Sequence, residues 1–575
     1  MVKTICTRQT IYLIIAIAIA LIGIFLVGPF YFVLFGKLVE TQIPLKENED
    51  GSYSKLTFYW QSFPVDEYWK HFLFNITNAD EFIYENAMPR LVEVGPYTYK
   101  EWEFKQEVTF FDNGNMVYYK NNKSWAFQPD LSCKYCLYGD YIMMPNPAFM
   151  AVVGEMFKWN QTSGANNFIL NLATMLVGEY PLRKIPIAGI LFDSYNDPLI
   201  DVINSPLYNL LLDKNGFIFG VKIPVIPALG YFPHFNHTCD EDYVAYTGKD
   251  DVKNTGKIVR WAGNTSLNWW KGDYASSLDC SDGSFNTPNL KKDQELKLFQ
   301  SLGCRTFRFK YDKKGNVGGI PTLDYKLKTD EFDTTLEKNW GYRYENYEKK
   351  DYVPSWPCGL NKPYNPNQKQ CDAMDCTLYE NWCDDCCNGT HYKDTVFMPP
   401  GIVPMRCQPG RTVEVPFAAF ISPPHFLWSP DEVTKSMVGL APDPVKHDPS
   451  LFQVHGLSGA AVKGLIRLQI SIPLYQDKAL LMMRHLRNAI IPCAWIELTV
   501  EMKSFAHRFM KLVMVTIPRI ILGIGISLII LPILAIVLYI SWGHWRKKTK
   551  QQGKIEAPLI EQSEAKQSER NDEWQ

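Results

Sequence analysis

Two long apolar segments, one near each end of the chain, dominate the hydrophobic pattern. Residues 11–35 and residues 520–542 contain no charged side chain. A helix of roughly 20 apolar residues crosses the hydrocarbon core of a membrane, and a single segment in lipid satisfies its own backbone only as a helix. We therefore predict one membrane-spanning helix in each segment. The bulky residues Phe30, Tyr31 and Phe32 replace the small residues of a signal-peptide cleavage site, which favours an uncleaved first span.

Basic residues beside the two segments predict their orientation. Lys3 and Arg8 precede the first, and the second is followed by Arg546, Lys547, Lys548 and Lys550. Short basic flanks stay in the cytoplasm. We therefore expect residues 1–10 and 543–575 in the cytoplasm, and residues 36–519 as one ectodomain outside the cell or in an organelle lumen.

Two kinds of residue between the predicted spans favour the same sidedness. All of the 14 cysteines except Cys6 lie there, as expected in an oxidising compartment. Their number in this region is odd, so at least one is free or joins two chains, and spacing leaves the connectivity open. The chain carries N-glycosylation sequons, all between the spans, at Asn75, Asn122, Asn160, Asn236, Asn264 and Asn388.

Two cysteine-containing clusters have the residue types of a metal site. Cys383 and Cys386 have a zinc-like spacing, but thiolate ligands need reduced cysteines, and an oxidising compartment favours disulfides. The other cluster is His234, His237 and Cys239, and the sequon at Asn236 would place a glycan inside it. We therefore predict no metal site.

Alternating apolar residues and turn residues predict a mainly antiparallel β ectodomain. Turns are expected at residues 112–115 and 313–316 between hairpin strands. The expected strands are 97–104, 107–111, 117–119, 306–311, 412–419 and 464–473. Helices are expected at 147–158 and 167–179, and the polar tail from Thr549 is expected to be disordered.

The segment 167–179 has an apolar face wider than one packed helix needs. Ile169, Leu172 and Leu176 recur at helical spacing, and Phe168 and Met175 widen the face. One interpretation is a buried core helix. The other is a partly exposed apolar cap that meets lipid or a partner.

Catalytic and nucleotide-binding motifs are absent from the sequence. It contains no G-x-S-x-G, H-E-x-x-H, P-loop or EF-hand pattern, and Gly523 and Gly525 inside the second span favour helix packing. The net charge of −2 gives no reason to expect a nucleic-acid partner. We predict neither an enzyme nor a cofactor.

Short motifs spread over the whole ectodomain resemble the class B scavenger receptor family, which includes a fatty-acid translocase, a high-density-lipoprotein receptor and a lysosomal integral membrane protein. They occur in family order between the two predicted spans. The motifs are Asn78-Ala-Asp-Glu-Phe82, Val92-Glu-Val-Gly-Pro-Tyr-Thr-Tyr99, Tyr195-Asn-Asp-Pro-Leu199, Gly230-Tyr-Phe-Pro233, Tyr246-Thr-Gly-Lys249, Trp269-Trp270, Cys304-Arg305, Gly319-Ile-Pro321, Ser422-Pro-Pro-His-Phe-Leu427, Gly439-Leu440 and Ile491-Pro492 with Trp495.

The resemblance implies both a fold and a function. The fold is α+β, an antiparallel β-barrel core with surrounding helices and an apical helical bundle. The function is a scavenger receptor for lipids, fatty acids, sterols or lipoproteins that passes cargo through an ectodomain tunnel to the membrane. A receptor for a protein ligand at the apex, in adhesion or trafficking and without lipid flux, is the alternative, and a membrane-tethered ectoenzyme is a weaker third. A homo-oligomer also stays open.

The resemblance also assigns roles to individual residues. It places 167–179 at the apex, so Phe168, Ile169, Leu172, Met175 and Leu176 become the expected ligand entrance. The basic residue that family members use there is missing from 167–179.

The resemblance also has implications for the cysteines and the cytoplasmic tail. Cys304 and Cys407 match a bridged family pair, whereas the partner of Cys280 is ambiguous. The plasma membrane is the expected location. A lysosomal membrane is the alternative, because Glu556-Ala-Pro-Leu-Ile560 resembles an acidic dileucine signal with the acid one place too close.

Overall fold

The computed structural model describes residues 2–206, 210, 229–232, 235–354, 395–396, 398–408 and 410–572. The chain divides into two compact units. One unit comprises Met1–Thr41 with Arg508–Gln575, and the other is Gln42–His507. Each unit is described by itself below.

The first unit consists of two long apolar helical stretches. One runs through α1 (Val2–Phe25), the π-helical segment η1 (Leu26–Leu34) and α2 (Phe35–Glu40). The other continues from α12 (Ser504–Lys511) through η11 (Leu512–Thr516) into α13 (Ile517–Asp572). Ile11–Glu40 and Ser504–Thr549 are long and apolar enough to cross a membrane. The chain is a two-span membrane protein.

The tail from Thr549 differs from the prediction of disorder. Helix α13 continues without a break to Asp572. The tail is rich in Lys, Gln, Glu and Ala, which are strong helix formers. The tail therefore forms a helix because of its intrinsic helix propensity, although it has too few apolar residues to build a core of its own.

Two glycines allow α1 and α13 to pack closely within this unit. A Cβ atom at Gly23 would lie 2.6 Å from the Gly525 carbonyl oxygen, and one at Gly525 would lie 2.8 Å from Val27 Cγ2. Small residues bring membrane helices together in this way. Helix packing is thus confirmed for Gly525, whereas a Cβ at Gly523 would meet nothing within 4 Å.

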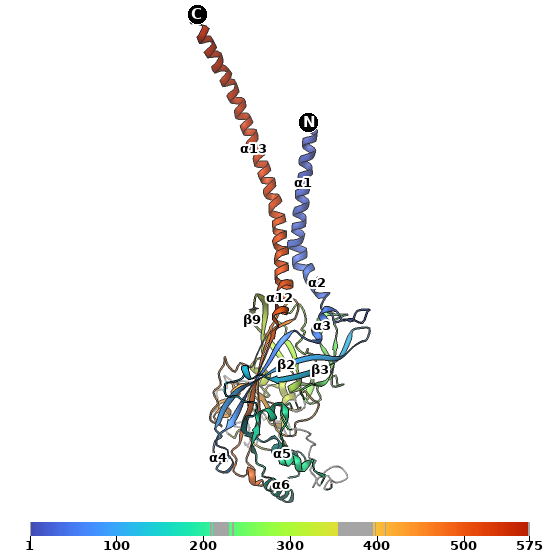
Figure 1. Cartoon of the computed structure of the whole chain (residues 1–575), viewed down its shortest axis with the longest axis vertical. Coiled ribbons are helices and arrows are strands. Elements are labelled where there is room, and N and C mark those ends of the chain that lie inside the picture. The colour runs from blue at the N-terminus through green and yellow to red at the C-terminus, as the bar shows by residue number, and fades with distance from the viewer. Residues whose placement is uncertain are drawn as a thin grey trace, which may run out of the picture. The chain divides into compact units, whose positions relative to one another are not determined.

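A 13-stranded antiparallel sheet forms the framework of residues 42–507 (Figure 1). Its main path, in spatial order, is β7 (Ile258–Trp261), β6 (Thr238–Tyr246), β3 (Met116–Phe127), β2 (Leu91–Phe111), β1 (Val65–Ile76), β17 (Ala489–Met502), β16 (Ala461–Leu474), β15 (Ser450–Val454), β10 (Ile320–Lys326), β9 (Arg305–Val317) and β8 (Leu296–Gln300). β14 (Phe420–Ser422) pairs with β16 and with β13 (Val403–Pro404). Two further strand pairs are β4 (Tyr141–Pro145) with β5 (Leu182–Pro186), and β11 (Tyr344–Glu345) with β12 (Thr395–Val396).

The sheet confirms one predicted hairpin turn and corrects two other expectations. Residues 112–115 connect β2 to β3 as predicted. The turn expected at 313–316 is wrong, because β9 runs through it and reverses at Gly318 and Gly319, both of which have positive φ. The strand expected at 412–419 is also wrong, because this segment, which contains Pro416, forms only an isolated bridge between Glu414 and Cys407.

The end strands of the main path, β7 and β8, do not pair with each other among the described residues. Both contact the segment Cys280–Ser281. Ile258 N–H donates to the Cys280 carbonyl at 2.8 Å, and Phe299 N–H donates to the Ser281 carbonyl at 2.8 Å. The described pairing is a large antiparallel sheet, and a closed barrel is not established by it.

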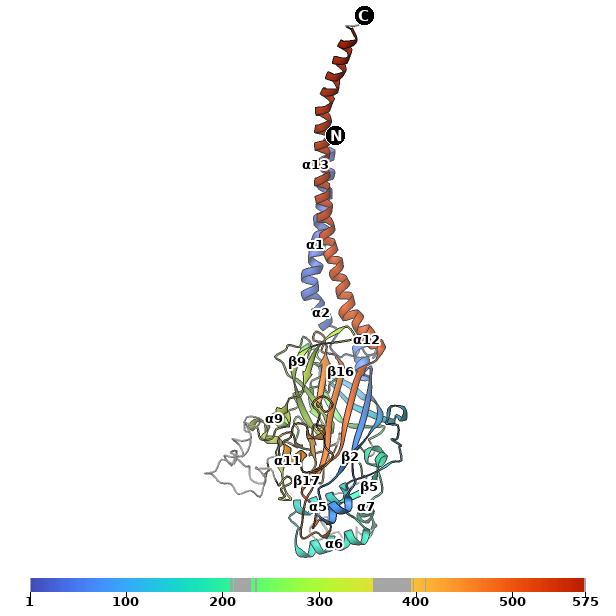
Figure 2. The same ribbon diagram turned by 90° about the vertical axis from the view of Figure 1, so that its left-hand side faces the viewer.

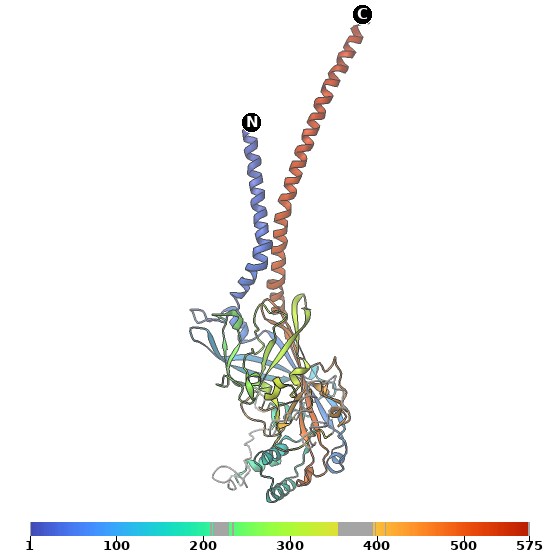
Figure 3. The same cartoon turned by 180° about the vertical axis from the view of Figure 1, so that it is seen from behind.

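Short helices gather at one end of this unit (Figures 1, 2 and 3). They include α5 (Pro147–Lys158), which has the predicted bounds, α6 (Gly164–Val177) and α7 (Pro198–Ile203). His507, the last residue of the unit, has Nε2 3.1 Å from the Val317 carbonyl oxygen of the β9–β10 hairpin. That hairpin lies at the other end of the sheet. We call the helical end the apex.

The other helices are α3 (Lys55–Gln61), α4 (Ala79–Tyr84), α9 (Gly272–Ser276) and α11 (Asp431–Thr434).

A buried ion cluster ties the apical helices together. Arg183 Nη1 pairs with Glu179, just beyond α6, and lies 3.1 Å from Asp197 Oδ2. Asp197 caps α7 through the Leu199 N–H, and Asn146, the N-cap of α5, donates to Glu179. Both carboxylate side chains are fully buried, so Arg183 neutralises charge that water does not reach.

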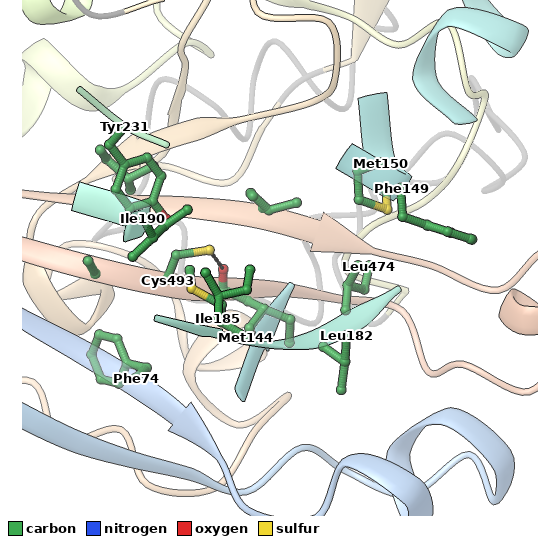
Figure 4. Packing of buried hydrophobic residues seen from close by; sticks show 14 of the residues in the cluster. Phe74, Met144, Phe149, Met150, Leu182, Ile185, Ile190, Tyr231, Leu474 and Cys493 are labelled. Carbon is green, nitrogen blue, oxygen red and sulfur yellow. Dashed lines mark hydrogen bonds between the residues drawn. The ribbon is translucent and has the colours of Figure 1, made fainter. Parts of the chain in front are cut away.

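The largest hydrophobic cluster lies between the sheet and the apical elements. Figure 4 shows Phe74 and Leu474 from the sheet near Met144 and Ile185 of the β4–β5 pair. Phe149 and Met150 of α5 belong to the same cluster. The apex is therefore attached to the sheet through a continuous apolar core.

Candidate functional site

An apolar cavity of about 50 Å³ lies against one face of the sheet, lined by residues of β1, β16 and β17 among others. Its wall is almost entirely apolar, and Gln300 is its one amide side chain among the described residues. The lining residues are Trp69, Phe232, Gln300, Leu302, Gly303, Phe307, Met405, Ile421, Ile466, Leu468, Ile470, Ile496 and Leu498. Such a wall suits an apolar chain rather than a polar ligand.

A larger chamber of about 280 Å³ adjoins this cavity. The two share the wall residues Trp69, Gln300, Leu302, Ile466 and Leu498. One side of the chamber is formed by Val65 at the start of β1 and by Lys503 just after β17. Lys503 directly precedes α12, so the chamber extends to the end of the unit from which the chain continues into its second span.

Charged residues line this chamber. Glu67 of β1, Glu101 and Glu103 of β2, Lys123 of β3 and Asp282 are in its wall. Lys123 Nζ lies 3.7 Å from Glu101 Oε1 and 3.5 Å from Glu103 Oε2. The chamber therefore joins a polar compartment to the apolar cavity.

The environment shifts the pKa values of these carboxyl groups in opposite directions. Burial, followed by repulsion from Glu101 and Glu103, raises the pKa of Glu67 well above its usual range. Burial raises the pKa of Glu101 as well. Burial acts in the same direction on Glu103, but attraction to Lys105 and Lys123 outweighs it and lowers the pKa to about 2.

An aromatic group fills the space on the apical side of the apolar cavity. His71 is fully buried, and neither ring nitrogen has a hydrogen-bond partner in the described part of the chain. Its ring packs against Trp69, Tyr99, Phe192 and Phe232. Burial lowers the pKa of His71 to about 3, so the ring is neutral at physiological pH.

The apex has a pocket of its own, of about 190 Å³. Its wall residues are Val153, Met156, Phe157, Thr162, Asn167, Asp477, Ala479 and Leu480. None of the five expected entrance residues on α6 is among them. The pocket lies where α5, the start of α6 and the loop around Leu480 meet.

The expected entrance residues mostly form an exposed stripe on α6. Phe168, Leu172, Met175 and Leu176 are 67, 47, 56 and 78% exposed, whereas Ile169 is half-buried. They recur at intervals of four, three and one residues, which places them on one side of a helix. The exposed cap, not the buried core helix, is the interpretation that matches this arrangement.

Two disulfides lie in the described residues of this unit. One joins Cys304 to Cys407, and the other joins Cys133 to Cys136. Cys280 is buried without a disulfide partner among the described residues, and the cysteines from Cys358 to Cys387 lie outside them. The Cys133–Cys136 pairing was not predicted, although a C-x-x-C spacing in an oxidising compartment is a signal for it.

The sequon asparagines occupy different surroundings. Asn160 and Asn264 are exposed, whereas Asn75 and Asn122 are half-buried. Asn236 is half-buried and exchanges two hydrogen bonds with the Trp125 backbone. The sequon residue Asn388 lies outside the described residues. So does His234, which belongs to the candidate metal cluster with His237 and Cys239.

One three-residue group, Glu93, His425 and His447, has the composition of a metal site. Backbone N–H groups donate to Nδ1 of both imidazoles, at 3.1 Å for His425 and 3.0 Å for His447. A neutral imidazole that accepts at Nδ1 carries its proton on Nε2, where a metal would have to bind. The geometry therefore favours hydrogen bonding over coordination.

The carboxylate of this group is already satisfied. Burial acts to raise the pKa of Glu93, but three donors outweigh it and hold the pKa at about 2. The donors, at 2.6, 2.9 and 3.0 Å, are His425, Trp495 and Lys446. The group anchors the His425 loop to the sheet.

Comparison with known proteins finds sequence matches over most of the chain, including both apolar helices. Residues 13–542 match the model of the CD36 family. An uncharacterised protein of Caenorhabditis elegans is 33% identical over 85% of this chain and 88% of its own length. Scavenger receptor class B member 1 of Bos taurus is 22% identical over 87% of this chain and 85% of its own. Lysosome membrane protein 2 of Mus musculus is 24% identical over 81% of this chain and 83% of its own. The chain therefore belongs to the CD36 family.

Proposed function

We propose that this chain is a receptor that binds lipids or lipoproteins and passes hydrophobic cargo through the interior of residues 42–507 to the membrane. The supporting observation is the shared wall of the apolar cavity and the chamber. Apolar cargo that follows such a wall avoids water, which is worth roughly 25 cal/mol per Å² of covered apolar surface.

A closed barrel is part of this proposal. The end strands β7 and β8 both bond to Cys280–Ser281, so one short segment bridges the two edges of the sheet. Closure would make the inner face an enclosed passage. Cargo would enter at the apical pocket and displace the aromatic group around His71 to reach the apolar cavity.

A plug in the apolar cavity tests the passage. A Cβ at Gly303 would have Ile421 Cδ1, at 3.4 Å, as its only neighbour within 4 Å, so Gly303→Leu adds volume to the cavity at little steric cost. The matched control is Gly139→Leu, at an exposed site where a Cβ meets nothing within 4 Å. We expect uptake of a fluorescent lipid with an uncharged headgroup to fall at least three-fold in Gly303→Leu only, at equal surface expression. Normal uptake by a well-expressed Gly303→Leu would reject the passage.

A second candidate function is a receptor for a protein ligand without lipid flux. The exposed apolar stripe on α6 favours it, because such surfaces mark interaction sites. Leu172→Glu and Met175→Glu, with Ala165→Glu on the same helix as control, separate the two functions. Reduced lipid uptake at normal surface expression supports an entrance at α6, and unchanged uptake in both variants means that the stripe is not the entrance.

The cellular location is proposed to be the plasma membrane, with a lysosomal membrane as the alternative. The relatives include a protein named as a scavenger receptor and one named as a lysosome membrane protein. Glu556-Ala-Pro-Leu-Ile560 in the tail is the segment that would act as the sorting signal. Co-staining of the full chain with markers of the two membranes, with and without Leu559→Ala, distinguishes them.

A further inference from the structure

We infer that the charged chamber binds the primary ammonium headgroup of a single-chain amphiphile, whose tail follows the adjoining apolar wall. This inference rests on the proposed passage and names a class of cargo for it. It is carried by the arrangement of carboxyl groups and lysines around the chamber.

The chamber wall places like charges directly opposite each other. Glu67 on β1 and Glu101 on β2 are register partners in the antiparallel ladder, and both line the chamber. Glu103, two residues along β2, faces the same space. Carboxylates in direct cross-strand opposition destabilise a sheet, so a purely structural wall gains nothing from this arrangement.

The nearby lysines do not form an ion pair with every carboxyl group of the wall. Lys123 of β3 is shared between Glu101 and Glu103. Lys105 is buried behind the wall, 3.0 Å from Glu103 Oε1 and 3.4 Å from Asp282 Oδ2. Lys123 attracts Glu67 as well, but no lysine lies within ion-pair distance of Glu67 among the described residues. Asp240 of β6 adds a further carboxyl group beside Lys123.

The other lysines of the wall lie at the edge of the chamber. Lys463 of β16 pairs with the exposed Glu501 of β17. Lys503, half-buried, follows the end of β17. Glu67 on β1 therefore faces mainly carboxyl groups from β2.

One buried oxygen in the wall lacks a donor. Glu101 is 4% exposed; its Oε2 accepts from the Trp69 indole, but its Oε1 accepts no hydrogen bond from the described residues while Glu67 is ionised. Lys123 Nζ lies 3.7 Å from this oxygen, beyond hydrogen-bond distance. A proton on Glu67 or an N–H from a ligand would complete it. A primary ammonium group supplies three donors and a positive charge.

The same geometry disfavours the opposite headgroup. A carboxylate in the chamber would approach Glu67, Glu101 and Glu103 in a partly buried space, where charges repel more strongly than in water. An uncharged hydroxyl would bring no positive charge to these carboxyl groups. Beyond the headgroup, Leu302, Ile466 and Leu498 continue from the chamber into the apolar cavity.

A matched set of ligands tests the inference. Radiolabelled dodecylamine, dodecanol and dodecanoate have equal tails and differ in headgroup, and their binding is measured on the full chain in nanodiscs at pH 7.5. Dodecylamine is expected to bind at least ten-fold more tightly than the other two. Equal or tighter binding of dodecanol or dodecanoate overturns the inference and leaves the passage intact. Failure of all three to bind overturns the passage as well.

Variants locate the binding. Glu101→Gln is expected to reduce the amine preference at least five-fold, whereas Glu501→Gln, at the exposed edge, preserves it. Because a proton on Glu67 competes with the ligand, amine binding should weaken from pH 7.5 to pH 5, and Glu67→Gln should flatten this dependence. An amine preference unchanged in both Glu101→Gln and Glu67→Gln places the ligand elsewhere and refutes the assignment.

Discussion

Trp69 donates its indole N–H to Glu101, and the same Trp69 side chain lines both the apolar cavity and the charged chamber. A single residue of β1 thus marks the point where the interior changes from apolar to polar. Trp69 also packs against His71, the buried histidine of the aromatic group. These contacts connect the proposed route of an apolar tail with the proposed site of a headgroup.

The Cys304–Cys407 disulfide is predicted to contribute more to stability than Cys133–Cys136. The two disulfides span 103 and 3 residues of sequence. Chain-entropy reasoning gives about 5 and about 2 kcal/mol. Thermal unfolding of the purified chain should show a larger loss of Tm when the Cys304–Cys407 pair is replaced by alanine. Equal losses for the two double variants would contradict this reasoning.

Arg183→Met is predicted to disrupt the apex. It leaves Glu179 and Asp197 buried without their cation, a change that costs roughly 3–5 kcal/mol. Surface expression should fall strongly, and Glu179→Gln in the same chain should restore part of it. Lys435→Met, which removes an exposed pair with Asp431, is the control expected to have little effect. Normal expression of Arg183→Met would show that the cluster is dispensable.

Asp240→Asn is predicted to stabilise the protein at neutral and alkaline pH. Burial raises the pKa of Asp240 to about 7, so the folded chain holds a proton that the unfolded chain releases above about pH 4. The wild type therefore loses stability as pH rises from about 4 to 7. Asn keeps an acceptor for the Tyr243 hydroxyl, which lies 2.8 Å from Asp240 Oδ2.

The measurement for Asp240→Asn is the difference in unfolding free energy from wild type at two pH values. The variant should gain roughly 2–4 kcal/mol at pH 8 and clearly less at pH 5. A gain that does not change with pH would mean that Asp240 titrates normally in the folded chain.

The orientation of the chain is predicted from its basic flanks. Tags at both termini should bind antibody only after permeabilisation, and Asn160→Gln and Asn264→Gln should each remove one glycan, since both asparagines are exposed. The readout is immunostaining together with gel mobility before and after deglycosylation. A C-terminal tag stained on intact cells would exclude the two-span orientation.

Sequence patterns predicted the parts of the fold that depend on local composition. Both spans, the bounds of α5 and the 112–115 hairpin follow from apolar runs, helical spacing and turn residues. The prediction of a disordered tail was wrong, because helix propensity extends α13 to Asp572. The strand expected at 412–419 was also wrong, because β propensity there is overruled by Pro416 and by the surroundings of Cys407.

The charged chamber was missed for a different physical reason. Glu67, Trp69 and His71 alternate along β1, as do Glu101 and Glu103 on β2. Charged residues at alternate positions are typical of a solvent-facing side of a sheet. In the folded chain this side of the two strands lines the chamber instead. The mixture of glutamate with Trp69 and His71 on one face was the available signal.

Photocrosslinking with a lipid probe tests the central claim most directly. A lipid with an uncharged headgroup and a diazirine in its tail is bound to the full chain in nanodiscs and irradiated, and the labelled residues are mapped by mass spectrometry. The account predicts labelling of three residues that line the apolar cavity and lie far apart in the sequence, Leu302, Met405 and Ile466. This labelling should be lost in Gly303→Leu but not in Gly139→Leu. Labels confined to the exposed α6 residues Phe168 and Leu176, with none in the interior, would contradict it.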